Sequence, residues 1–113
     1  MGEIIPLSKI DKYVAPNTAT LVGGSFDLFN VSYLRFLKDC SDCGRPLVVI
    51  IQSDSSVRIR KGFNRPVVGQ KHRAEIVAAL CFVDYVIVLP KPPHHKKYLA
   101  KIKPKIYPKM VRS

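Results

Sequence analysis

The pattern of apolar and polar positions predicts buried strands that alternate with helices. Residues 47–51 are an uninterrupted apolar run, and residues 83–89 form a second run in which Asp84 is the only charged residue. Residues 19–23 form a shorter run that leads into two glycines. Runs of this kind are typical of strands buried on both faces of a parallel sheet. We therefore predict three central strands, and a last short strand at residues 105–107.

Two longer segments between these strands repeat their apolar residues at helical spacing. The first runs from about Asn30 to Cys43, where Asn30 can cap the start and Gly44 can end the helix. The second covers residues 70–81, and a short helix is predicted at residues 55–60. The positions expected to face the core are Tyr33, Phe36, Leu37 and Cys40 in the first helix, and Ala74, Val77, Ala78 and Cys81 in the second.

Strands and helices in this alternation build βαβ units with right-handed crossovers, which places the chain in the α/β class. In open parallel sheets, ligands bind beyond the carboxyl ends of the strands. The loops at residues 23–29, 52–62 and 90–95 follow those ends. We therefore expect these three loops to share one edge of the sheet and to form the ligand site.

Length and charge add a division of the chain and a class of partner. The 113 residues fit one domain, with a lead-in at residues 1–18, a core at 19–90 and a basic, proline-rich segment at 91–113. That last segment holds eight Lys and Arg residues and no acid, whereas the first ninety residues hold eleven basic and eight acidic residues, a net of +3. The total of +11 favours polyanions, namely nucleotides, nucleic acid or an acidic membrane surface, without choosing among them.

Three classes of feature are disfavoured by the sequence. No apolar run reaches the roughly 18 residues that suggest a membrane span, and no basic region followed by an apolar stretch marks a signal peptide. Three cysteines, an odd number in an α/β chain, indicate reduced thiols and a cytoplasmic setting. Cys40 and Cys43 form one C-x-x-C at the end of a helix with no second pair, so no metal site is predicted.

The turn Gly23-Gly24-Ser25 connects the first predicted strand to the first predicted helix. A strand that passes through small residues into a helix presents unpaired N–H groups, and the positive end of the helix dipole, to an anion. Glycines also let a phosphate approach the backbone closely. The spacing matches neither the dinucleotide-binding nor the P-loop fingerprint. Asp27, beside this turn, is interpreted as a cap or brace for the start of the helix.

Residues 24–33, Gly-Ser-Phe-Asp-Leu-Phe-Asn-Val-Ser-Tyr, resemble the first motif of the cytidylyltransferase-like nucleotidyltransferases, G-[TS]-F-D-x-x-H-x-G-H. This family includes glycerol-3-phosphate and ethanolamine-phosphate cytidylyltransferases and the adenylyltransferase of heptose synthesis. Asn30, Ser32 and Tyr33 stand where the family has His, Gly and His. Three later segments resemble the family's K-G-x-x-R-P, R-x-E-I…V-D-x-V and L-K-P-D-V-Y motifs, at residues 61–66, 70–86 and 102–107.

The resemblance implies a three-layer, Rossmann-like α/β fold with a parallel sheet of four to five strands in the order 3-2-1-4-5. It implies that CTP or ATP is the substrate, with Mg²⁺, and that CMP or AMP passes to a small phosphorylated molecule while pyrophosphate leaves. The expected nucleotide-binding residues are Gly24, Ser25, Phe26 and Tyr33, and the expected catalytic residues are Lys61, Arg73 and Asn30.

A second hypothesis remains open beside this one. Asn30 can hydrogen-bond a phosphate but cannot become a cation, and Tyr33 is neutral at pH 7. The chain can therefore also be a catalytically inactive member of the family that binds a nucleotide, a nucleic acid or a protein. The basic segment at 91–113 would serve the nucleic acid. Family members commonly dimerise, which leaves a homodimer as an open expectation.

Overall fold

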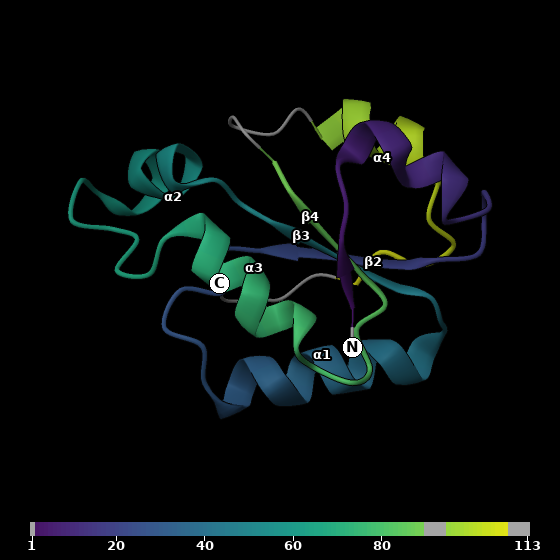
Figure 1. Cartoon of the computed structure of the whole chain (residues 1–113), viewed down its shortest axis with the longest axis horizontal. Coiled ribbons are helices and arrows are strands. Elements are labelled where there is room, and N and C mark those ends of the chain that lie inside the picture. Colours follow the sequence, from purple (N-terminus) through teal and green to yellow (C-terminus); the bar gives the residue numbers. More distant parts are fainter. Residues whose placement is uncertain (1, 90–94, 109–113) are drawn as a thin grey trace.

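A parallel sheet with helices on both faces forms the molecule, and this confirms the predicted three-layer α/β fold (Figure 1). The computed structural model describes residues 2–89 and 95–108. In chain order the elements are β1 (Glu3–Ile4), the 3-10 helix η1 (Leu7–Lys12), β2 (Thr20–Gly24), α1 (Val31–Cys43), β3 (Leu47–Ile51), α2 (Asp54–Lys61), α3 (Gln70–Ala78), β4 (Tyr85–Val88) and α4 (His95–Ile102).

The strands lie in the order β1-β4-β3-β2, and every pair is parallel. The three predicted central strands therefore adjoin as expected, and a parallel bridge between Thr20 and Ile106 places the end of the described chain beside β2. The predicted order needs a correction at the other edge. There β1, inside the segment interpreted as an irregular lead-in, pairs with β4. A strand of two residues is too short to leave a period-2 pattern in the sequence.

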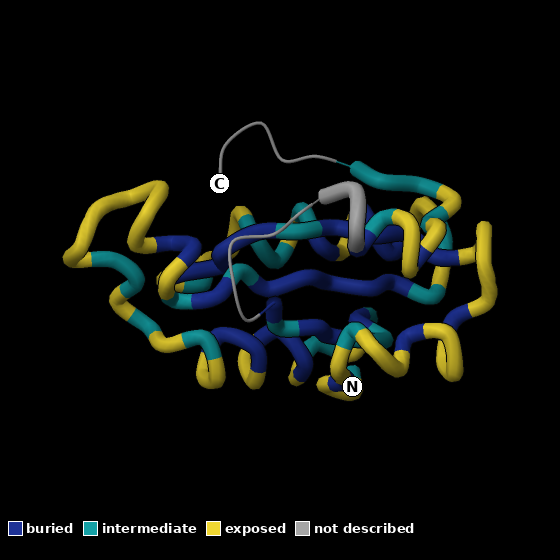
Figure 2. Tube along the Cα trace, turned by 90° about the horizontal axis from the view of Figure 1, so that it is seen from above, coloured by how far each residue is buried: buried dark blue, intermediate teal, exposed yellow. Residues whose placement is uncertain are grey.

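Each face of the sheet buries a separate apolar core because successive side chains of a strand point to opposite faces. Val22, Val49 and Val86 pack towards α1 and α3, whereas Leu21 and Val48 pack towards η1 and α4. The central strands are buried and the surrounding helices and loops carry the exposed residues (Figure 2). Full burial of one such side chain is worth about 1.5–3 kcal/mol. The uninterrupted apolar runs therefore reflect a sheet covered on both sides.

The predicted helices form with small shifts at their ends. Asn30 caps α1 through a hydrogen bond from the Ser32 N–H to its Oδ1 at 2.9 Å, and Gly44 follows the last turn with φ of +155°. The helix predicted to reach residue 81 ends at Ala78, and Cys81 is exposed. Its assignment to the core face is therefore wrong. The chain turns at residues 79–82, so helical spacing no longer applies to Cys81.

Part of the predicted ligand edge and of the basic segment falls outside the described residues. This concerns residues 90–94 of the third loop and residues 109–113 of the terminal segment. Within the described ranges, no helix is long and apolar enough to cross a membrane.

Candidate functional site

The turn after β2 has an unusual backbone and a buried interior. Ser25, Phe26 and Asp27 are buried, and both Phe26 and Leu28 adopt positive φ angles, of 50° and 53°. Residues other than glycine adopt this conformation rarely, and such positions concentrate at functional sites. In the part of the chain that the structure describes, the N–H groups of Ser25 and Phe26 make no hydrogen bond. The turn therefore leaves two backbone donors free beside the start of α1.

Arg73 of α3 holds this turn from inside the protein. Its side chain is fully buried, and its NH1 donates to the Ser25 carbonyl at 2.7 Å. Its Nε donates to the Val68 carbonyl at 2.8 Å, and its NH2 pairs with Asp54 Oδ1 at 2.8 Å. The guanidinium thus joins the turn after β2, the loop before α3 and the start of α2. These contacts favour a positioning role over direct contact with a phosphate.

Asp27 ties the same turn to the loop between α2 and α3. Its carboxylate accepts hydrogen bonds from the N–H groups of Val67 at 2.9 Å and Val68 at 2.8 Å, and it pairs with Arg65 at 3.4 Å. Burial alone would raise the pKa of Asp27, but these hydrogen bonds and the Arg65 charge together hold it below its ordinary value. The interpretation of Asp27 as a brace for the start of α1 is wrong, since Asn30 caps that helix and Asp27 bonds a loop 40 residues away.

Lys61 is brought from the end of α2 to the turn. Its Nζ donates to Ser25 Oγ at 3.2 Å. Burial of the amine is the largest cause that lowers the pKa of Lys61, and the positive charge of Arg60 is the next. The charge of Asp27 raises this pKa, whereas the charges of Arg65 and Arg73 lower it further. Positively charged side chains that lie close together create a positive electrostatic potential, and such a potential attracts an anion. Ser25 is therefore the point at which free amides and a cation meet.

Asn30 and Tyr33 occupy the start of α1. The Asn30 side chain accepts from the N–H groups of Ser32 and Tyr33, at 2.9 and 3.4 Å, and donates to the Leu28 carbonyl at 3.3 Å. The Tyr33 ring packs edge-on against Phe26, with ring centroids 5.4 Å apart, and also contacts Phe29. Both residues therefore help to shape the turn and the helix start.

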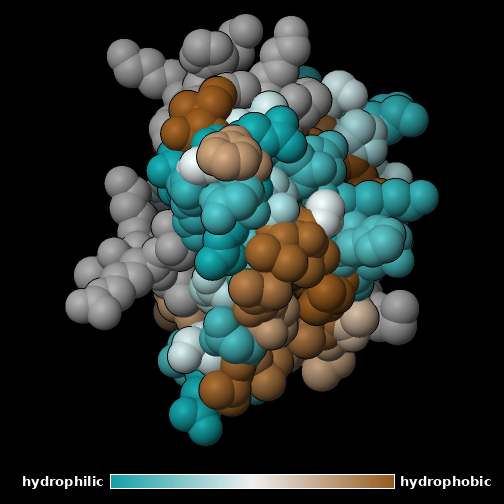
Figure 3. All heavy atoms as spheres, turned by 90° about the vertical axis from the view of Figure 1, so that its left-hand side faces the viewer, coloured by the Kyte–Doolittle hydropathy of each residue, from teal (hydrophilic) through white to brown (hydrophobic). Residues whose placement is uncertain are grey.

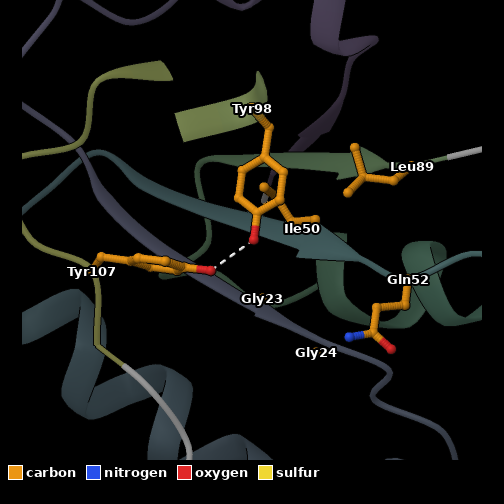
Figure 4. Close-up of a pocket in the computed structure, with 7 residues that line it drawn as sticks. All are labelled: Gly23, Gly24, Ile50, Gln52, Leu89, Tyr98 and Tyr107. Atoms are coloured by element: carbon orange, nitrogen blue, oxygen red, sulfur yellow. Dashed lines mark hydrogen bonds between the residues drawn. The ribbon is translucent and has the colours of Figure 1, made fainter. Parts of the chain in front are cut away.

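A hollow of about 60 Å³ opens at the carboxyl ends of β2 and β3. It is lined by Gly23, Gly24, Ile50, Gln52, Leu89, Tyr98 and Tyr107. The hydroxyls of Tyr98 and Tyr107 lie 2.7 Å apart, and Gln52 extends from the end of β3 on the other side (Figure 4). The Gln52 N–H donates to the Gly24 carbonyl at 3.0 Å, so the hollow and the turn at Ser25 share a wall.

Apolar side chains surround the turn on the outside. Five of the eight exposed large hydrophobic side chains among the described residues belong to this end of the molecule: Leu28, Val31, Ile59, Phe63 and Val67. Figure 3, which looks at this end, shows an apolar area set among polar side chains. No group of three His, Cys, Asp or Glu residues within the described ranges could hold a metal ion.

Sequence reasoning found the turn and Lys61 but missed two contributors. Gln52 is the first polar residue after the apolar run of β3, at the carboxyl end of the strand, and this was the available signal. The contact of Asp27 with Val67 and Val68 spans some 40 residues and leaves no local pattern. The predicted roles of Asn30, Lys61 and Arg73 in the transfer step stay predictions.

Residues 21–112 match the family described as cytidylyltransferase-like. The bifunctional protein HldE of Geobacter sulfurreducens is 45% identical over 65 residues, covering 58% of this chain and 13% of that protein. The bifunctional protein HldE of Helicobacter pylori strain P12 is 36% identical over 86 residues, covering 76% of this chain and 19% of that protein. The chain thus spans less than a fifth of the length of these relatives.

A solved structure agrees with the fold. The lipopolysaccharide core biosynthesis protein of Thermoplasma volcanium superposes with a TM-score of 0.72 at 24% identity, over 80% of this chain and 71% of that one. The likeness concerns the arrangement of strands and helices.

Proposed function

Because the chain belongs to the cytidylyltransferase-like family, we propose that it transfers AMP or CMP from ATP or CTP to a small phosphorylated acceptor. Pyrophosphate is the other product. An oxygen of the acceptor phosphate attacks the α-phosphorus, and the bond from that phosphorus to the bridging oxygen of the pyrophosphate breaks. No covalent intermediate with the protein is required, so positioning and charge stabilisation supply the catalysis.

The observation that carries this proposal is the meeting of Lys61 with Ser25. The Lys61 amine reaches a turn whose Ser25 and Phe26 N–H groups have no partner among the described residues. Three donors of this kind suit phosphate oxygens, since charged and backbone donors near a helix start both favour anions. Gly24 leaves room for the Phe26 ring that packs under the turn, because a Cβ at this position would lie 3.0 Å from Phe26 Cε2.

The other site residues act through this turn. Arg73 holds the Ser25 carbonyl and thereby sets the direction of the neighbouring N–H groups. Asn30 fixes the start of α1, and Tyr33 packs Phe26 into place. Mg²⁺ usually keeps several waters and is bound through substrate phosphates and one or two carboxylates. Asp27, a carboxylate of the same turn, is already engaged by the N–H groups of Val67 and Val68, so the phosphates of the substrate and waters would supply most of the ligands.

Calorimetric titration with ATP and CTP, with and without Mg²⁺, tests nucleotide binding directly. We expect micromolar binding of one nucleotide, and pyrophosphate release when a sugar phosphate is added. Lys61→Met should weaken transfer by about 10²–10³-fold, as the loss of one donor to a developing charge does. Lys12→Met is the matched control, because Lys12 is an exposed lysine on η1, in the layer opposite α3. Absence of binding to either nucleotide would refute the proposal.

An inactive binding protein is the second candidate function, and the hydrogen bonds of the Asn30 side chain favour it. Its side chain is committed to the helix cap, where the family has a histidine that contacts phosphate. The triple change Asn30→His, Ser32→Gly and Tyr33→His tests this candidate. Nucleotide binding without turnover in the natural chain, and pyrophosphate release in the triple variant, would identify an inactive member. Turnover in the natural chain would exclude it.

A further inference from the structure

An exposed surface at one end of the molecule combines apolar and basic side chains. The loop between α2 and α3, residues 62–69, reaches the left-hand end of the molecule and is mostly exposed (Figure 1, Figure 2). The N–H groups of Val67 and Val68 in this loop donate to Asp27, so the turn before α1 adjoins the loop. We call this end, with the exposed side chains of residues 28–35 and 58–71, the mixed surface.

The apolar members of the mixed surface are far more exposed than packing requires. Phe63 is 90% exposed and Ile59 is 73% exposed, the two highest values among the large exposed hydrophobic side chains of the described residues. Three more lie in the adjoining segments: Leu28, Val31 and Val67. Figure 3 shows apolar side chains at this end with polar ones around them. Single exposed hydrophobic residues are ordinary, whereas a group of them rimmed by polar residues marks an interaction site.

The basic members of the mixed surface carry charge that nothing nearby compensates. Residues 25–35 and 53–74 together hold seven Lys and Arg residues and two acids. Both acids are already paired, Asp27 with Arg65 and Asp54 with Arg73. Within the described ranges, four exposed basic side chains of this end make no ion pair or hydrogen bond: Arg35, Arg58, Arg60 and Lys71. The partner of this surface is therefore anionic.

Three kinds of partner differ in how well they use both properties. A second copy related by a two-fold axis would bring the same uncompensated cations face to face, which opposes association. Single-stranded nucleic acid needs aromatic rings on which its bases stack, and Phe63 is the one exposed aromatic residue that the structure describes on this surface. An anionic membrane accepts apolar side chains below its headgroups and attracts cations to its lipid phosphates. It is the partner that uses every exposed member.

The local geometry of α2 suits contact with such a membrane. Ile59 lies between Arg58 and Arg60 in the sequence, and neighbouring residues of an α-helix point about 100° apart. The two guanidinium groups therefore flank the Ile59 side chain. Phe63 follows one turn later, just beyond the end of the helix.

We propose that the mixed surface binds the face of an anionic membrane. Phe63 and Ile59 enter the boundary between headgroups and acyl chains, and Arg58 and Arg60 pair with lipid phosphates. The contact is peripheral. The proposal is independent of the proposed function, because it requires neither the Lys61 amine nor the N–H groups of the turn after β2.

Co-sedimentation of the whole chain with lipid vesicles tests this proposal. We expect the protein to sediment with phosphatidylcholine vesicles that contain phosphatidylglycerol and to stay in solution with phosphatidylcholine alone. The bound fraction should fall as NaCl is added, because salt screens the attraction between the cations and the lipid phosphates.

Two variants test the apolar contribution. Phe63→Ser and Ile59→Ser should each lower the partition coefficient for the anionic vesicles by about tenfold, through loss of buried apolar area. Ile4→Ser is the matched control, because Ile4 is also exposed but lies on β1, outside the mixed surface. It should leave the partition coefficient unchanged. Thermal unfolding verifies that each variant folds.

Two further variants test the basic contribution. Arg58→Gln and Arg60→Gln should each lower the partition coefficient by about fivefold, the effect of one cation near an anionic surface. Lys12→Gln removes the same charge from η1, in the layer opposite α3, and should leave the coefficient unchanged.

Three outcomes would overturn the proposal. The first is that the chain does not sediment with the anionic vesicles. The second is that Lys12→Gln lowers partition as much as Arg60→Gln, which would assign the binding to total charge. The third is that the chain binds oligodeoxythymidylate through Arg58 and Arg60, with no loss in Ile59→Ser and no vesicle binding, which would assign the surface to nucleic acid. Persistence of vesicle binding when no nucleotide binds would support the proposal even if the proposed function failed.

Discussion

Replacement of Arg73 by methionine tests the structural core of the site. The change removes the hydrogen bonds to the Ser25 and Val68 carbonyls and the ion pair with Asp54, while the Met chain fills much of the same space. Breaking a buried ion pair by removing one partner costs about 3–5 kcal/mol. The lower end applies here, because the Asp54 side chain is 38% exposed and water can solvate it. Most of the loss then comes from the two carbonyls, at about 1–3 kcal/mol for each group left unsatisfied.

We therefore expect Arg73→Met to lower the free energy of unfolding by about 3 kcal/mol. For a domain of this size, that is a decrease in Tm of about 12 °C. Urea unfolding followed by far-UV circular dichroism measures the change, since the chain has no Trp. Arg73→Lys should lose nearly as much, because a single ammonium cannot reach the three acceptors that the planar guanidinium joins.

Arg45→Met provides the control, since Arg45 forms a surface ion pair with Asp84 and its side chain is 54% exposed. Exposed pairs contribute little to stability because water and salt screen the two charges. If Arg73→Met cost no more than Arg45→Met, the three contacts of Arg73 would not hold the turn, and its role as a positioning residue would be refuted. A full loss of nucleotide affinity in an Arg73→Met variant that folds as stably as the natural chain would instead support the catalytic role that the resemblance implies for Arg73.

Three further predictions address other parts of the site and the core. The pKa of Asp27 is lowered in the folded chain, so its contribution to stability is complete above its unfolded pKa of about 4 and is lost as the pH falls through the lower native pKa. Asp27→Asn should accordingly reduce the free energy of unfolding at pH 7. The difference in this free energy between the variant and the natural chain should be smaller at pH 3, and an equal difference in urea titrations at pH 7 and pH 3 would contradict the prediction. Asn30→Ala should cost about 0.5–2 kcal/mol through loss of the α1 cap, whereas Asn30→Asp should retain it; equal midpoints of thermal unfolding would count against the cap. Leu37→Ala, which removes a fully buried side chain of α1, should cost about 2–5 kcal/mol in urea unfolding, and a loss below 1 kcal/mol would mean that α1 packs differently.

The sequence was sufficient for the central architecture because continuous burial leaves a continuous apolar pattern. The runs at 47–51 and 83–89, and the helix that starts after Asn30, needed nothing beyond local spacing and caps. β1 was not predicted because two residues are too few to show an alternating pattern. Cys81 was assigned to the wrong face because the chain leaves the helix after Ala78. The first error is a missed edge strand, and the second lies just beyond the end of a helix.

The site was predicted less completely because its contacts are remote in sequence. The turn at residues 23–25 could be recognised from its glycines and from the motif around Asp27. The buried position of Arg73 could not, since an arginine on a helix is usually exposed and its three acceptors come from separate segments. The hollow beside Gln52 depends on the approach of α4 to the sheet, which no local pattern encodes.

The short pairings at both margins of the sheet have a consequence for self-association. A bare strand margin offers a row of unused amide and carbonyl groups to which another polypeptide can add, the first step of aggregation. Glu3 and Ile4 pair with the edge of β4, and Ile106 pairs with the start of β2. These few residues therefore occupy backbone groups that another polypeptide could otherwise bind. Their removal would expose a template for intermolecular strand addition.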